Sequence, residues 1–145
     1  GVEGLKQYFR KNGINRNSER TNTELYLFST LPPTIRIEVL EDYLQKDSNS
    51  LVLEKLSKAY GKADQLEKLK ERLVDWIEKG YTDQNMAEML YESAEILNRY
   101  ADRFPIAKGM EQARANFDAA MSVVKDPVDE EFREIMESIF NEIVS

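Results

Sequence analysis

The chain has 145 residues, 41% of them hydrophobic and 32% charged, which is the composition of a soluble globular domain. It contains no cysteine and no histidine, which excludes disulfides, thiol chemistry, imidazole acid–base catalysis and zinc sites built on either residue. The net charge of −7 disfavours nucleic acid and anionic membranes, and no apolar run reaches the length of a membrane span. We expect one domain over residues 1–145 with no membrane contact, and the lack of cysteine fits a cytoplasmic, intracellular location.

Hydrophobic residues recur every three or four positions along most of the chain, which is the period of amphipathic helices. Glycine, proline and small polar residues separate these segments. The expected helices cover residues 2–12, 23–29, 33–46, 51–60, 63–79, 83–104, 106–125 and the stretch from Pro127 to Ile143. Because every segment is amphipathic and the connections are short, the sequence predicts an all-α fold, a compact bundle of six to eight amphipathic helices.

Individual residues predict the helix ends and part of the core. Gly13 and Gly61 are expected to end the helices that precede them, since glycine readily adopts the left-handed conformation of a C-cap. Ser50 and Asp126 are expected to cap the helices that follow them. Trp76, the only tryptophan, shares the apolar face of its helix, so we expect it to be buried.

Charge is unevenly distributed along the chain. Residues 1–24 hold five basic and three acidic residues, whereas residues 126–145 hold one basic and seven acidic residues. The N-terminal segment is therefore expected either to contact an acidic partner or to pack against the acidic C-terminal helix.

The segment KGYTDQNMAEMLYESAEILNRY (79–100) has two alternative interpretations. Divided by a turn at residues 91–93, it resembles the helix-turn-helix of LuxR-type bacterial regulators, through Gly80, Thr82, Ala87, Leu90 and Ser93. That resemblance implies a DNA-binding regulator using residues 80–103. Its expected DNA contacts are Ser93, Asn98, Arg99 and Arg103.

The alternative is one unbroken amphipathic helix over residues 83–104. Its stripe consists of Met86, Met89, Leu90, Ser93, Leu97, Tyr100 and Phe104. Two acidic residues favour this interpretation. Glu92 stands at a turn position that is usually apolar, and Glu95 would face the phosphates of DNA.

The segment LPPTIRIEVLEDYL (31–44) resembles the opening of an F-box, the motif by which substrate receptors dock on the adaptor of a ubiquitin ligase. The matching residues are Leu31, Pro32, Ile35, Val39, Leu40 and Leu44. The resemblance implies an F-box-like adaptor using residues 31–44. The later tryptophan of the motif has no counterpart, since Trp76 comes too late in the chain.

A third pattern is acidic. Glu130, Glu131 and Glu134 spell EExxE, which resembles the first half of the Mg²⁺ motif of all-α nucleotide pyrophosphatases. The second half is missing, and acidic residues in a first helical turn also stabilise the helix dipole. We therefore expect no metal site, no cofactor and no enzymatic activity.

The five methionines lie in the last three of the predicted helices, and flexible thioether side chains suit adaptable binding surfaces. They are Met86, Met89, Met110, Met121 and Met136, which are either core residues or candidate partner contacts. We expect a non-catalytic regulatory or adaptor module that acts through protein–protein contacts, a class that includes inhibitor, immunity and phage-encoded proteins. The sequence identifies neither the partner nor the oligomeric state.

Overall fold

A computed structural model describes residues 1–99 and 104–142, and within these ranges the protein is all-helical, as the sequence predicted. The helices are α1 (Val2–Asn12), α2 (Glu19–Phe28), α3 (Pro33–Leu44), α4 (Ser50–Lys62), α5 (Leu66–Glu78), α6 (Gln84–Arg99), α7 (Met110–Val123) and α8 (Glu130–Asn141). None of them combines the length and the apolar character that a bilayer-spanning helix needs.

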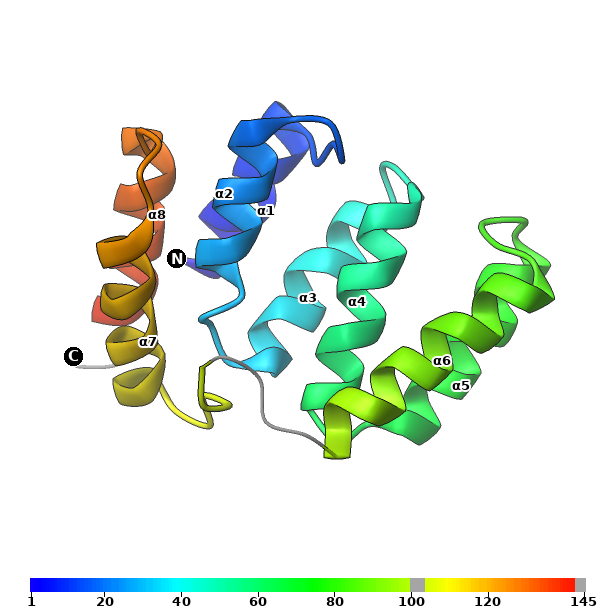
Figure 1. Cartoon of the computed structure of the whole chain (residues 1–145). Helices are drawn as coiled ribbons and strands as arrows, with labels where there is room; N and C mark the ends of the chain where they lie inside the picture. The colour runs from blue at the N-terminus through cyan, green and yellow to red at the C-terminus, as the bar shows by residue number, and fades with distance from the viewer. Residues whose placement is uncertain (100–103, 143–145) are drawn as a thin grey trace.

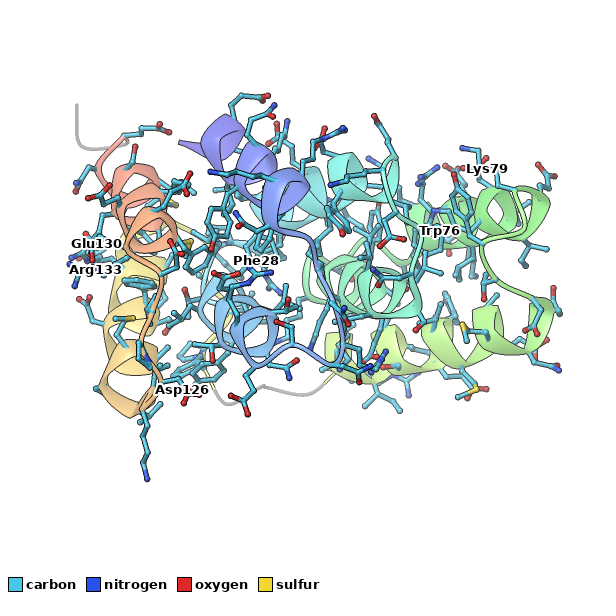
Figure 2. The ribbon with its side chains drawn as sticks, turned by 90° about the horizontal axis from the view of Figure 1, so that it is seen from above. Phe28, Trp76, Lys79, Asp126, Glu130 and Arg133 are labelled. Atoms are coloured by element: carbon cyan, nitrogen blue, oxygen red, sulfur yellow. The ribbon has the colours of Figure 1, made fainter. Side chains whose placement is uncertain are left out.

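The helices form a row of antiparallel pairs arranged in two layers (Figure 1). The pairs follow one another in the order α7–α8, α1–α2, α3–α4 and α5–α6, so the last pair of the chain lies beside the first. Helices α8, α1, α3 and α5 form one layer, and α7, α2, α4 and α6 form the other (Figures 1 and 2). The most extensive helix contacts join α4 to α6 and α3 to α4.

The core runs along the row between the two layers. Near α1 it is aromatic: the Phe9 ring meets the Phe28 ring edge-on at 5.5 Å between centroids, and Phe132 of α8 lies 5.5 Å from Tyr8. Trp76 is 0% exposed, which confirms its predicted burial. Seen from above, Trp76 lies toward one end of the row, and Glu130 and Arg133 lie at the other (Figure 2).

Several predicted helix starts are wrong by a few residues because a different polar side chain provides the cap. Ser18 accepts a hydrogen bond from the Thr21 N–H at 3.2 Å, so α2 begins at Glu19 and not near Thr23. The cap of α4 is Asn49 and not Ser50, and the cap of α8 is Asp129 and not Asp126.

Several predicted helix ends also need correction. Helix α4 continues through Gly61 to Lys62, helix α3 ends at Leu44, and α5 spans a shorter range than residues 63–79. The glycine prediction holds at Gly13, where φ is 82° just after α1.

The segment between α6 and α7 contains less helix than predicted. Helix α6 is described to Arg99, residues 100–103 lie outside the described residues, and Phe104 is in a bend. Helix α7 begins at Met110 and not at residue 106. Before it, the irregular backbone is held by the side-chain amide of Asn116, which donates a 2.8 Å hydrogen bond to the carbonyl of Pro105. The Asn116 side chain thus provides the hydrogen bond that the Pro105 carbonyl would have received from a backbone N–H within a helix.

Candidate binding groove between α2 and α4

A groove of about 400 Å³ opens between α2 and α4. These two helices lie in the same layer of the row (Figure 1). They are not among the closely packed helix pairs, and side chains of α3 and α6 line the space between them. The residues that line the groove come from four helices, from the loop before α2 and from the turn after it. They are Arg16, Asn22, Leu25, Tyr26, Phe28, Ser29, Arg36, Leu40, Leu51, Glu54, Lys55, Lys58, Lys62 and Leu97.

Helical spacing explains why these side chains converge. Leu51, Lys55, Lys58 and Lys62 follow one another at intervals of four, three and four residues, so they lie along one face of α4. On α2, Asn22 and Tyr26 do the same, and Ser29 follows three residues later at the C-cap. The floor is apolar, because it includes leucine side chains from α2, α3, α4 and α6.

The rim of the groove is strongly basic. Among the described residues, the lining holds the cations Arg16, Arg36, Lys55, Lys58 and Lys62 and a single carboxylate, Glu54. This concentration of positive charge contrasts with the net charge of −7 of the whole chain. The described lining is therefore a local concentration of positive charge on an acidic molecule.

Glu54 holds two of these cations. It accepts hydrogen bonds from Arg16 at 3.0 Å and from Lys58 at 3.1 Å. Burial raises the pKa of Glu54, but the hydrogen bonds from Arg16 and Lys58 outweigh this effect and leave the pKa below its ordinary value. Glu54 therefore stays ionised and acts as a fixed acceptor for the basic rim.

Arg36 is fixed at the base of the groove. It is buried, with 8% of its surface exposed, and its Nε donates a 3.0 Å hydrogen bond to the carbonyl of Leu31, just before α3. This bond sets the direction of the side chain, so its charge is held close to the apolar floor.

Lys55 is the least satisfied of the cations. It is half-buried, and within residues 1–99 and 104–142 it makes no hydrogen bond or ion pair. Burial lowers the pKa of Lys55, and the positive charges of Lys58, Arg16 and Arg36 lower it further, against an opposing effect of Glu54. A desolvated amine beside other cations costs stability in the empty protein, and an anion would relieve that cost.

The three predicted DNA-contacting residues that the structure describes do not form a basic surface. Helix α6 passes through residues 91–93 without a turn, as the continuous-helix interpretation predicted, so the proposed helix-turn-helix is not present there. Ser93 is half-buried, Asn98 is exposed, and Arg99 pairs with Glu95 at 3.0 Å. Arg103 lies outside the described residues.

The buried face of α6 also differs from the predicted apolar stripe by about one residue along the helix. The helix buries Ala87, Leu90 and Ala94 against α4 and α5, whereas Met89 is 68% exposed. The small alanines allow the helices to approach closely, which the methionine side chains would prevent.

The residues that resemble an F-box lie mostly inside the core. Leu31, Val39, Leu40 and Leu44 are all buried, and Ile35 is partly buried against the core. Only Leu40 of this set reaches the groove. The leucine and valine spacing of residues 31–44 is thus explained by packing within the chain.

The five methionines do not share one surface. Met86 and Met89 are exposed on α6, Met110 and Met121 are partly buried on α7, and Met136 is buried in α8. Helix α6 lies at the opposite end of the row from α7 and α8 (Figure 1). A partner contact at the exposed pair stays a prediction, and none of the five lines the groove.

The acidic N-terminal turn of α8 is engaged in surface ion pairs. Glu130 pairs with Arg133 at 2.9 Å and Glu131 with Lys11 at 3.7 Å. The second pair joins α8 to α1, so the basic N-terminal segment packs against the acidic C-terminal helix. Among the described residues, no group of three acidic, histidine or cysteine side chains is arranged to hold a metal ion.

Sequence reasoning did not identify the groove. The spacing of Lys55, Lys58 and Lys62 was visible as a basic helix face. However, Arg16 and Arg36 join that face only through the packing of a loop and of α3 against α4, which local periodicity does not encode.

Comparisons with known proteins found no match to this chain among family models, curated proteins or solved structures. The function must therefore be inferred from the chemistry of the groove.

Proposed function

We propose that this protein is a non-catalytic regulatory or adaptor module that acts through protein–protein contacts, and that the groove between α2 and α4 is its binding surface. The observation that carries this proposal is the open, leucine-floored groove with basic side chains and with a half-buried lysine, Lys55, that has no partner in the described part of the chain. An apolar floor with a few placed polar groups is the usual composition of a recognition site.

The groove is better suited to recognition than to catalysis. Glu54, the one carboxylate in the described part of the lining, is held ionised by Arg16 and Lys58, so it is a poor proton donor near neutral pH. Its lysines are spread along roughly 10 Å of α4, from Lys55 to Lys62 at about 1.5 Å per residue, instead of converging on one reacting atom. Such spacing fits contact with an extended surface.

Site-specific photo-crosslinking tests this proposal. A photoreactive amino acid replaces Asn22, an exposed residue of the groove, and in a matched control it replaces Glu78, an exposed residue of α5 in the other layer. We expect a polypeptide adduct from cells of the source organism at position 22 and not at position 78. Equal labelling at both positions, or no polypeptide adduct at position 22, would contradict the proposed binding surface.

A further inference from the structure

We infer that the groove between α2 and α4 binds an acidic segment of a partner polypeptide, whose carboxylates pair with Lys55 and its neighbouring cations while its apolar side chains contact the leucine floor. This inference rests on the proposed function, because it specifies the chemistry of the partner at the same surface.

The charge of the lining selects an anionic ligand. Of the residues that the structure describes, five cations and one carboxylate line a groove on a molecule whose net charge is −7. Other cations of the chain are paired within it: Arg10 pairs with Asp42, Arg72 pairs with Glu41, and in the groove Arg16 and Lys58 pair with Glu54. Lys55 has no such pairing among the described residues, and the like charges of Lys58, Arg16 and Arg36 act on it against the opposing charge of Glu54. Its ammonium is therefore available to a carboxylate from outside.

Glu54 shows how a carboxylate sits in this groove. Its two oxygens accept separate hydrogen bonds, one from Arg16 and one from Lys58, at ordinary charge-assisted distances of 3.0 and 3.1 Å. A ligand carboxylate at Lys55 would extend this arrangement along α4. Glu54 also competes with the ligand, since it occupies two of the cations that the ligand could use.

The shape of the groove favours a polypeptide over other anions. A free phosphate would fill a small part of 400 Å³ and would leave the leucine floor exposed to water. A nucleic acid would be repelled by the acidic remainder of the molecule, and Tyr26 and Phe28 are the only aromatic side chains in the described lining for base stacking. A segment that alternates carboxylates with aliphatic side chains matches both the rim and the floor.

Selection from a random 12-residue peptide display library tests the inference without assuming the identity of the partner. We expect the selected peptides to be enriched in Asp and Glu interspersed with aliphatic residues. The binding site of a selected peptide is then located from shifts of the amide signals of α2 and α4, and its affinity is measured by fluorescence anisotropy.

Two variants of the groove should change the affinity in opposite directions. Lys55→Gln should weaken binding of a selected peptide by about tenfold or more, because it removes a partly desolvated charge pair. Glu54→Gln should strengthen binding by roughly two- to fivefold, because it removes the competing carboxylate. The matched controls, Lys68→Gln and Glu71→Gln, make the same charge changes at exposed positions of α5 and should leave the affinity unchanged.

The outcomes separate this inference from the proposed function. If the selected peptides shift the amide signals of the groove but are not enriched in Asp and Glu, the inference of an acidic ligand is overturned. The groove would then remain a protein-binding surface, as the proposed function states. Failure to select any peptide would overturn both, as would groove shifts produced by inorganic phosphate or polyuridine alone. Equal effects of Lys55→Gln and Lys68→Gln would show that bulk charge and not the groove controls the affinity.

Discussion

Glu24 is a carboxylate with only 1% of its surface exposed, on the buried side of α2. The Tyr8 hydroxyl and the Arg20 guanidinium both donate hydrogen bonds to its oxygens. Arg20 in turn donates to the carbonyls of Asn12 and Gly13, at 2.8 and 3.2 Å. The buried charge is thus fully paired, which is the condition under which an ionised group is tolerated inside a protein.

Burial nevertheless raises the pKa of Glu24 above its ordinary value of 4.5, and the hydrogen bonds from Tyr8 and Arg20 offset only part of that rise. The folded protein therefore protonates Glu24 at a higher pH than the unfolded chain does. The stability that this difference in the pKa of Glu24 provides is complete below the pKa of the unfolded chain. It is lost as the pH rises through the pKa of the folded protein. We predict that the free energy of unfolding of the wild type, relative to Glu24→Gln, decreases as the pH is raised from about 4 to about 7.

Urea denaturation of both proteins at several pH values measures this difference, with Glu71→Gln as the exposed control. A difference that is independent of pH, or that increases with pH, would show that Glu24 is ionised as readily in the folded state as in the unfolded chain.

Trp76 combines complete burial with an unsatisfied donor. Its ring is 0% exposed, the Arg72 guanidinium lies 5.6 Å from the ring centroid, and its Nε1 has no hydrogen-bond partner among the described residues. We predict that Trp76→Ala lowers the free energy of unfolding by about 3–5 kcal/mol, because it leaves a large cavity. Trp76→Phe should cost markedly less, since it keeps an aromatic ring and removes the unpaired N–H.

Chemical denaturation followed by circular dichroism measures both effects, and Val74→Ala, at an exposed position of the same helix, should stay within about 0.5 kcal/mol of the wild type. Trp76 fluorescence with the maximum of a water-exposed indole, in the folded wild type, would be incompatible with the buried position.

At the scale of elements, the packing of α4 against α6 depends on Gly61. A Cβ atom at this position would lie 2.3 Å from the carbonyl oxygen of Ala94 in α6, which is a backbone atom and cannot move alone. Gly61 therefore allows α4 and α6 to pack at short range, and Ala94 on the facing helix is small for the same reason. Glycine is favoured both at a helix C-cap and at a close contact between helices, and the sequence alone does not distinguish the two roles. The prediction that Gly61 ends a helix was wrong for this reason.

We predict that Gly61→Ala lowers the free energy of unfolding by about 1–3 kcal/mol, the usual cost of an overpacked contact, because α4 and α6 must separate. Gly4→Ala is the matched control, since it lies within α1 and its nearest neighbour to an added Cβ is 3.9 Å away. That substitution should be neutral or stabilising by up to about 1 kcal/mol through helix propensity. If Gly61→Ala and Gly4→Ala changed the free energy of unfolding by the same amount, this would contradict the close contact between α4 and α6.

Sequence patterns predicted the helices better than their ends. Leucines and aromatics at spacings of three and four located the eight helices of the described residues, because burial of one face is a local property of the sequence. The caps were misplaced where two polar residues stand close together, as with Asn49 beside Ser50 and Asp129 after Asp126, and only the backbone hydrogen bond distinguishes them. The site was missed for a related reason, since its cations come from segments that tertiary packing brings together.

For the whole molecule, the order of the helix pairs in space links the two ends of the chain. Helix α8 packs against α1, and the Phe132 ring, which is 0% exposed, lies 5.5 Å from the Tyr8 ring and 6.1 Å from the Phe9 ring. The buried residues form one continuous cluster from this aromatic group to Trp76 in α5. A row of helix pairs that shares one core should unfold as a single unit, whereas a row with independent pairs would unfold in stages.

Phe132→Ala distinguishes these two possibilities, because Phe132 and Trp76 lie in helix pairs at opposite ends of the row (Figure 1). We predict that it lowers the free energy of unfolding by about 3–5 kcal/mol, as for other large aromatic deletions in a core. The midpoints followed by circular dichroism and by Trp76 fluorescence should decrease together, because the loss at α8 is transmitted through the shared core to α5. Val123→Ala, at an exposed position of α7, should leave both transitions within about 0.5 kcal/mol of the wild type. Loss of part of the helical signal at low denaturant, with the Trp76 transition unshifted, would instead show that α7 and α8 form a separately folding unit.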